Sequence, residues 1–360
     1  MSMVRLSPGE RVVILGAGAS RGGSFVKPGY AECLPPLNAD FFTQLQRIRT
    51  KKHLDLTRSV IVDVVTTFGS NFSLTLEEYF THLESMLAAA KRSYRTDRAL
   101  APKQVEDMRT RLLDALAAVL EESTDVTRRN PRTGVEMPVC DYHGAIVDVL
   151  KARDTVITFN YDCVMDHALR KRGEGKWSAQ YGYGFPGPSR VEGHEYWSAA
   201  DPPRGLNATI NLLKLHGSVN WFPLPEKGAP SSIRLRRRTY RQNGSSHYEI
   251  VPPEFVKRID EKPALLQIWR YAELAIRKAR VLAFIGFSFT PADLHAESTF
   301  RLALSGNKVL EKVVIANPNR DHRAKIRSVL ATPLRELKVP VVQYDDLAGL
   351  AVDVPTALSR

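Results

Sequence analysis

Two polar clusters of the sequence carry side chains that could do chemistry. Asn160 and Asp162 follow the apolar run 156–159, and His216 follows the apolar run 210–215. An Asn amide can orient a substrate or a water molecule, and a His with an ordinary pKa of about 6.5 is available as a neutral base near pH 7. These residue types favour acid–base chemistry with His216 as the general base. Taken singly, the first two could instead be turn and N-cap residues, and the third a core histidine.

A glycine-rich turn follows the first apolar run of the chain, 11–15. The turn comprises Gly16, Ala17, Gly18, Ala19 and Ser20. Glycines allow the backbone to approach a pyrophosphate, and the start of the following helix attracts its negative charge. Arg21 replaces the third glycine of the dinucleotide-binding pattern, and no strand with an acidic end follows about 20 residues later. This departure argues against a hydride-transferring dehydrogenase, and a tight turn without a ligand remains the alternative.

Five apolar runs separated by helical stretches must position these clusters. The runs are 11–15, 156–159, 210–215, 281–285 and 313–315. Each run ends in small or polar residues, as the last two do at 286–288 and 316–318. Continuous apolar strands of this kind are typical of a parallel sheet that is covered by helices on both faces. We therefore predict an α/β, Rossmann-like fold in which all five clusters face one crevice at the carboxyl ends of the strands.

The chain between the first two apolar runs has a different character. Residues 41–150 are predicted to form an inserted helical subdomain, because apolar residues recur at helical spacing behind a capping box at 75–78. Residues 1–40 and 151–360 are predicted to form the catalytic domain. Within it, the region 176–255 is rich in Gly and Pro and is expected to be a loop-rich, lid-like segment.

Composition narrows the class of protein. The 360 residues are 43% hydrophobic and 25% charged, which is ordinary for a globular protein and excludes collagen-like and disordered classes. No apolar stretch approaches the roughly 20 residues of a membrane span, and the N-terminus lacks a signal-peptide pattern, so we expect a cytoplasmic protein without membrane contact. The three cysteines, Cys33, Cys140 and Cys163, form no C-x-x-C pair, so no metal site is expected.

The formal net charge of +12 is the unusual bulk property. It could favour nucleic acid, an acidic partner or an anionic small molecule, and a basic surface without a specific partner is equally compatible with it. The basic run 233–241 is interpreted as a solvated or subunit-facing segment in preference to a nucleic-acid contact.

In their order along the chain, these motifs resemble the sirtuin family, and more closely its divergent prokaryotic branch associated with antiphage defence. Five motifs of that family have counterparts in this sequence. They are the glycine turn at 16–20, the Asn-x-Asp motif at 158–162, the catalytic-histidine motif at 215–217, the Gly-x-Ser turn at 286–288 and a following Asn at Asn317. The resemblance implies that Asn160 and His216 are catalytic. It further implies that NAD⁺ is bound by Gly16, Ala17, Gly18, Ser20, Asn160, Asp162, Gly286, Ser288 and Asn317.

One departure from the deacylase sirtuins bears on the activity. Those enzymes carry two zinc-binding cysteine pairs after the histidine, whereas residues 217–280 here contain no cysteine. Long inserted helices before Asn160 instead resemble the defence-type proteins. The resemblance therefore implies an NAD⁺ glycohydrolase that releases nicotinamide and ADP-ribose and depletes NAD⁺. An NAD-dependent protein deacylase and a non-catalytic NAD-binding module are the alternatives.

The same resemblance implies control of the activity, because constant NAD⁺ hydrolysis would poison the host. We expect a homo-oligomer, with a HerA-like ATPase or another sensor of the defence system as a partner, while nucleic acid stays an open alternative.

Overall fold

A six-stranded parallel sheet forms the centre of the protein. The computed structural model describes residues 7–26, 33–92, 101–124, 140–185, 190–191, 203–224, 232–235, 248–255, 257 and 259–359. The strands of the sheet lie in the order β4-β2-β1-β7-β8-β9. They are β4 (Asn211–Lys214), β2 (Thr155–Thr158), β1 (Arg11–Leu15), β7 (Val281–Ile285), β8 (Lys312–Ala316) and β9 (Val341–Tyr344).

The strand order places β1 at the centre, where the chain reverses its direction of winding. The first half of the sheet builds outward from β1 through β2 to β4, and the second half builds from β7 through β8 to β9. Leu15 is in register with both Thr158 and Ile285. This is the doubly wound order of dinucleotide-binding sheets, and their ligands bind beyond the carboxyl ends of the strands at such a switch point.

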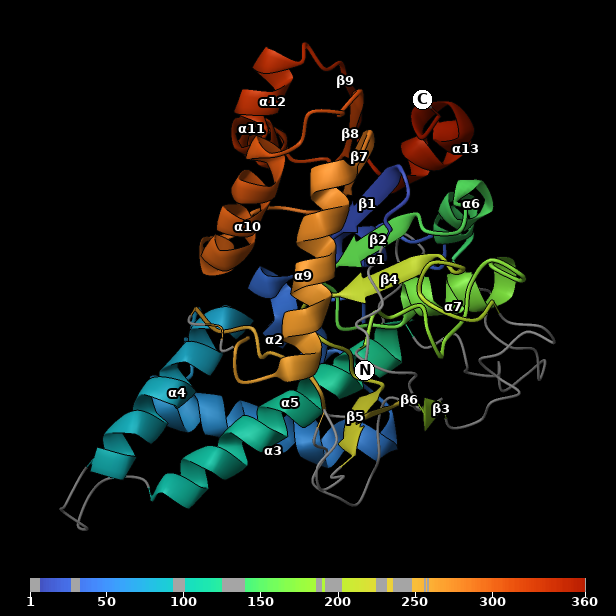
Figure 1. The fold of residues 1–360 in the computed structure, drawn as a ribbon. Helices are drawn as coiled ribbons and strands as arrows, with labels where there is room; N and C mark the ends of the chain where they lie inside the picture. The colour runs from blue at the N-terminus through green and yellow to red at the C-terminus, as the bar shows by residue number, and fades with distance from the viewer. Residues whose placement is uncertain are drawn as a thin grey trace.

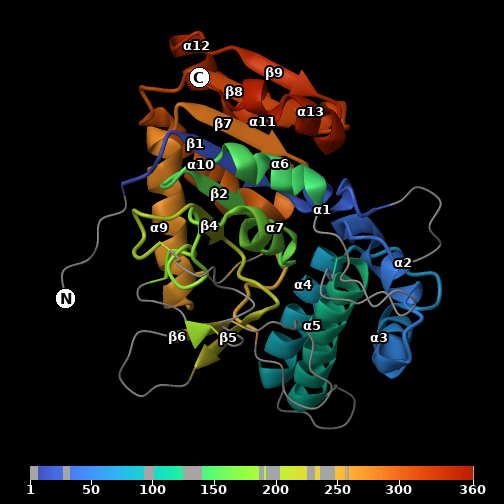
Figure 2. The ribbon, with the colours of Figure 1, turned by 90° about the vertical axis from the view of Figure 1, so that its right-hand side faces the viewer.

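Helices cover both faces of the sheet (Figures 1 and 2). One face carries α6 (Asp141–Val149), α7 (Val164–Arg172) and α13 (Leu347–Ala357), and α6 packs against both of the others. The opposite face carries α9 (Pro263–Lys278), α10 (Leu294–Ser305), α11 (Arg320–Val329) and α12 (Ala331–Glu336). The predicted Rossmann-like α/β architecture is confirmed.

The five predicted strands are buried almost completely, which explains their continuous apolar runs. The sixth strand, β9, was not predicted. Its four residues are exposed or half-buried at the edge of the sheet, so the apolar pattern there is short and weak.

Between α1 (Ala17–Arg21) and α6, the described residues form four α-helices. They are α2 (Phe41–Gln46), α3 (Lys51–Phe68), α4 (Leu76–Arg92) and α5 (Pro102–Thr124), with the short 3-10 helix η1 (Asn38–Asp40) before them. The helices α3 and α4 pack on α5 around an apolar core that contains Phe41, Phe80 and Leu112. The predicted capping box is present, since the amide of Thr75 donates to Glu78 Oε2 at 2.8 Å.

Three further points concern the predicted division of the chain. Helix α6 lies inside the predicted insertion 41–150 but packs with the sheet layer, against α7 and α13. The region 176–255 contains a small sheet, in the order β3-β6-β5, of β3 (Arg190–Val191), β6 (Ser232–Leu235) and β5 (Trp221–Leu224). Much of that region, and the basic run beyond residue 235, lies outside the described residues. The domain boundaries and the lid therefore stay predictions.

No helix within the described ranges is both long and apolar enough to cross a membrane.

Candidate active site

Two glycine turns interlock at the switch point between β1 and β7. The Gly18 amide donates to the Gly286 carbonyl at 2.9 Å. Gly286 has a φ of +55°, and a Cβ placed there would lie 2.1 Å from the Ala19 nitrogen. A Cβ on Gly16 would lie 2.6 Å from the Gly286 oxygen. The glycines are therefore required for the close approach of the two strand ends.

A cavity of about 390 Å³ opens beside the crossing of these two glycine turns, at the carboxyl ends of the strands. Of the residues predicted from the sequence, its lining includes Gly16, Ala17, Ser20, Asn160, Asp162, His216 and Ser288. Gly18, Gly286 and Asn317 are not part of the lining. Asn317 instead donates from its side chain to the Phe287 carbonyl at 2.9 Å and so shapes the turn that carries Ser288. The fold thus brings residues from four distant segments of the sequence to one cavity.

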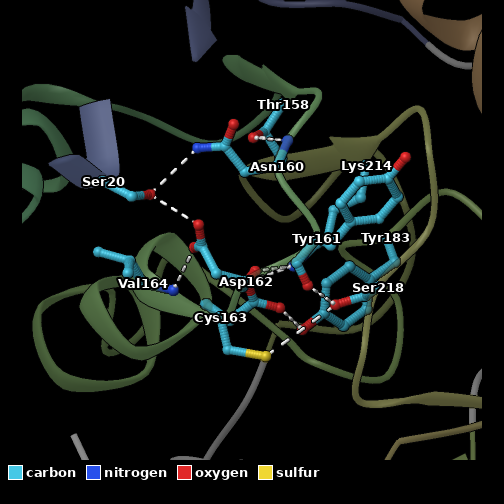
Figure 3. Close-up of polar contacts among 11 residues, drawn as sticks. Ser20, Thr158, Asn160, Tyr161, Asp162, Cys163, Val164, Tyr183, Lys214 and Ser218 are labelled. Atoms are coloured by element: carbon cyan, nitrogen blue, oxygen red, sulfur yellow. Dashed lines mark hydrogen bonds and ion pairs between the residues drawn. The ribbon is translucent and has the colours of Figure 1, made fainter. Parts of the chain in front are cut away.

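Asn160, Asp162 and Ser20 form one hydrogen-bonded group (Figure 3). Asn160 Nδ2 donates to the Gly16 carbonyl at 2.9 Å and to Ser20 Oγ at 3.1 Å. Ser20 Oγ donates in turn to Asp162 Oδ2 at 2.7 Å. The amide nitrogen of Asn160 is therefore committed to protein acceptors, whereas its side-chain oxygen accepts no hydrogen bond from the described residues and is the atom that a ligand can use.

Asp162 also fixes the start of α7. Its Oδ1 accepts the amide of Val164, the first residue of α7, at 2.9 Å, which closes a turn around the N-cap residue Cys163. Asp162 therefore shapes the turn into α7 and also lines the cavity.

A buried ion pair supports this group from behind. Lys214 is fully buried, and its Nζ lies 2.9 Å from Asp166 Oδ2 and donates to the Asp162 carbonyl. Tyr183 donates to the other Asp166 oxygen at 2.6 Å. Burial alone would lower the pKa of Lys214, but the surrounding acidic groups, with Asp166 the foremost of them, together outweigh burial and hold the pKa above its ordinary value. The ammonium is thus charged and fixes the loop that carries Asn160.

His216 is buried between aromatic rings. Its ring is edge-on to Phe159, with centroids 5.1 Å apart, and stacks on Tyr161 at 5.9 Å. Burial, against the opposing effect of Asp293 and with a smaller contribution from Lys257, lowers the pKa of His216 to about 3. The imidazole is therefore neutral at pH 7.

One ring nitrogen of His216 is left without a protein partner. Nε2 is buried, has no hydrogen-bond partner among the described residues and lies 3.7 Å from Asp293 Oδ1. In a neutral imidazole one nitrogen carries the proton and the other is an acceptor, so with the proton on Nδ1 the Nε2 atom is an acceptor that a ligand or a water molecule can use.

Three charged residues of the cavity were missed by sequence reasoning. Asp293 Oδ1 lies 3.7 Å from His216 Nε2 and 3.2 Å from Lys257 Nζ. Glu77, at the start of α4, also lines the cavity, and burial raises its pKa despite the nearby Lys257. Asp293 follows a Thr-Pro pair in the sequence, which is typical of an ordinary helix start, so its type and spacing carried no separate signal.

The helical insertion and the segment directly before it supply the apolar wall of the cavity. The insertion contributes Leu76, Leu116 and Leu120, and the preceding segment contributes Pro35, Pro36 and Leu37. An Arg21–Asp40 ion pair ties η1 of this wall to the helix of the glycine turn. The cavity is therefore enclosed between the sheet and the insertion, with polar groups on the sheet side.

Within the part of the chain that the structure describes, no group of three or more His, Cys, Asp or Glu side chains is arranged to hold a metal ion.

A family model described as a SIR2-like domain matches residues 154–333, which is half of the chain. The matched segment runs from β2 into α12 and includes Asn160, His216 and Ser288, while the glycine turn lies before it. No curated protein matches the chain.

Proposed function

Because this chain belongs to the SIR2-like family, whose domains bind NAD⁺, we propose that it hydrolyses NAD⁺ to nicotinamide and ADP-ribose. One observation carries the proposal: a cavity at the switch point of the sheet holds Asn160 together with a neutral His216 whose Nε2 has no hydrogen-bond partner among the described residues. This pair offers an orienting oxygen and a proton acceptor at the place where such sheets bind dinucleotides.

The residues of the cavity fit the substrate. Its volume of about 390 Å³ lies within the range of roughly 300–1,000 Å³ that is common for ligand sites. Gly16 and Ala17 present backbone without bulky side chains, as a pyrophosphate requires, and Ser288 lies on the neighbouring turn. Asn160 Oδ1 is suited to accept from the carboxamide of nicotinamide or from the attacking water.

The reaction needs one bond to form and one to break. The water oxygen bonds to the anomeric carbon of the ribose, while the bond from that carbon to the nicotinamide nitrogen breaks and its electron pair leaves with the nicotinamide. His216 Nε2 accepts a proton from the water, which is then released to solvent. A base of low pKa is sufficient, because a water molecule that bonds to an electron-poor carbon becomes strongly acidic. The nearby Asp293 carboxylate stabilises the imidazolium that forms.

The first test measures the products directly. Purified protein is incubated with NAD⁺, with and without an acetylated peptide, and nicotinamide and ADP-ribose are quantified by chromatography. We expect release that does not depend on the peptide, and a loss of at least about 100-fold in Asn160→Ala and His216→Gln. The matched control is His143→Gln, which replaces a histidine of similar burial that does not line the cavity and is expected to retain turnover.

Other products would contradict the proposal. Formation of O-acetyl-ADP-ribose that depends on the peptide would instead indicate a deacylase. Tight NAD⁺ binding without turnover, both in vitro and in phage-infected cells that express the protein, would indicate a regulatory binding module.

For the biological role, we propose an antiphage effector that depletes NAD⁺ and acts as a homo-oligomer under the control of a sensor such as a HerA-like ATPase. The physical support is that an unregulated NAD⁺ hydrolase would exhaust the NAD⁺ of its own cell. NAD⁺ measured through an infection should fall in cells that carry the protein and its partner genes, and it should stay constant in cells that carry His216→Gln.

A further inference from the structure

Three side chains that can carry charge meet at one point of the cavity. His216 Nε2 lies 3.7 Å from Asp293 Oδ1, and the same carboxylate oxygen lies 3.2 Å from Lys257 Nζ. The side chains of His216, Asp293 and Lys257 are 6%, 10% and 3% exposed. Charges at this depth are poorly screened by water, so each of them strongly affects whether its neighbours hold a proton.

Lys257 is held in place from both walls of the cavity. Its Nζ donates to the Glu254 carbonyl at 3.1 Å, and the Phe255 amide of the same loop donates to Thr81 Oγ1 on α4 at 3.0 Å. Glu77, at the start of α4, lines the cavity and interacts electrostatically with the same ammonium. The ammonium is thus fixed by its own loop, which the helical insertion holds.

The neighbours of His216 act on its imidazole in opposite directions. Asp293 favours the imidazolium, whereas burial, Lys257 and His295 disfavour it. A carboxylate at this distance typically raises the pKa of such a group by about 1–3 when nothing balances its charge. Tyr161, which stacks on the imidazole, brings no charge, because burial raises its pKa well above the ordinary value.

We propose that Lys257 is a positioning residue whose ammonium balances the charge of Asp293 and so keeps the imidazole of His216 unprotonated and ready to accept a proton. The proposal rests on His216 as the base of the proposed function. Without the lysine, the imidazole would lie against an unbalanced buried carboxylate and would hold a proton before the reaction begins. With the lysine, the carboxylate remains 3.7 Å away to stabilise the imidazolium once it forms.

The test follows the protonation of His216 by NMR on the full-length protein without any ligand. The histidines are isotope-labelled, and the signals of His216 are those that disappear in His216→Gln. In the wild type we expect the neutral imidazole throughout the range of about pH 5 to 8. In Lys257→Gln, which keeps a hydrogen-bond donor beside Asp293 but removes the charge, the pKa of His216 should rise to about 5 or above.

Further variants separate the charge of Lys257 from a structural role. Lys257→Arg keeps the charge and should keep His216 neutral. Lys257→Gln combined with Asp293→Asn removes both charges, so the pKa of His216 should fall back below about 5. The matched control is Lys262→Gln, because Lys262 pairs with Glu249 at 3.3 Å and does not line the cavity. This control should leave the titration of His216 unchanged.

Two results would overturn the proposal. One is a titration of His216 in Lys257→Gln that matches the wild type, and the other is a double variant that is protonated as readily as Lys257→Gln. In the hydrolysis assay, Lys257→Gln should lose turnover as the pH falls through the raised pKa, because only the neutral imidazole accepts a proton. The titration needs no turnover, so a failure of the hydrolase assignment would appear as absent product with the raised pKa intact.

Discussion

Lys214 is the last residue of the buried strand β4, and its contacts show how single residues can determine the local structure of the site. Its ammonium is fully buried with Asp166 and Tyr183, directly behind the loop that carries Asn160. An ion pair at this depth gains little over an apolar pair, but the loss of one partner leaves the other charged and buried.

We predict that Lys214→Met lowers the free energy of unfolding by about 3–5 kcal/mol, as measured by urea denaturation. The matched control is Lys308→Met, because Lys308 pairs with Glu336 at 3.7 Å on an exposed surface. That variant should change stability by less than about 1 kcal/mol. Equal effects of the two substitutions would show that the buried pair has no special role.

Part of the site could be predicted from the sequence at this scale. Asn160, Asp162 and His216 each follow an apolar strand, so the topology had to bring them to the same edge of the sheet. Asp293 and Lys257 could not be predicted, because neither follows a strand directly. Their proximity to His216 depends on how the loops fold in three dimensions.

Among the elements, the crossing of the two glycine turns decides whether the cavity exists. Gly286 has left-handed backbone dihedrals and lies against the backbone of Ala19. A side chain at this position would therefore strain the backbone and also overlap with the Ala19 nitrogen. Gly175 has a comparable φ of +70°, but a Cβ added there would meet no atom within 4 Å. A substitution of Gly175 therefore measures the cost of backbone strain without that of steric overlap.

We predict that Gly286→Ala destabilises the fold by about 2–5 kcal/mol and weakens NAD⁺ binding, because the turn carrying Gly16 is displaced. Gly175→Ala should cost only about 1–2 kcal/mol and leave NAD⁺ affinity unchanged. Thermal unfolding and calorimetry on both variants check this. Unaltered NAD⁺ affinity in Gly286→Ala would show that NAD⁺ binding does not depend on the contact between the two glycine turns.

The elements themselves were largely predictable. Five buried strands produced continuous apolar runs, and helical periodicity revealed the insertion before β2. The edge strand β9 gave too weak a pattern, because a strand that faces solvent needs fewer apolar residues. The strands β5 and β6 lie in a region whose Gly and Pro content favoured a prediction of loops.

At the scale of the whole molecule, the cavity lies between two hydrophobic cores, that of the sheet and that of the inserted helices. Residues 35–39 and the helices α4 and α5 form one wall, and the glycine turn with the loops after β2 and β4 forms the other. A ligand that fills the cavity must therefore contact both parts of the chain.

We predict that carbocyclic NAD⁺, an analogue that cannot be hydrolysed, slows amide hydrogen exchange in 37–39 and at the start of α4 as well as in the glycine turn, because binding stabilises the closed arrangement of both walls. Mass spectrometry of exchanged peptides measures this, with nicotinamide alone as the control ligand. Protection confined to the sheet side would show that the insertion does not take part in binding.

The central position of β1 also affects when the protein can become active during its synthesis. This strand is made first, yet its neighbour β7 begins roughly 270 residues later, so at ~5–20 residues per second the ribosome needs on the order of 15 to 50 seconds to supply it. Until then the glycine turn lacks the backbone of Gly286 that fixes it. A nascent or prematurely terminated chain therefore has no assembled cavity, and any activity of that cavity begins only after most of the protein has been translated.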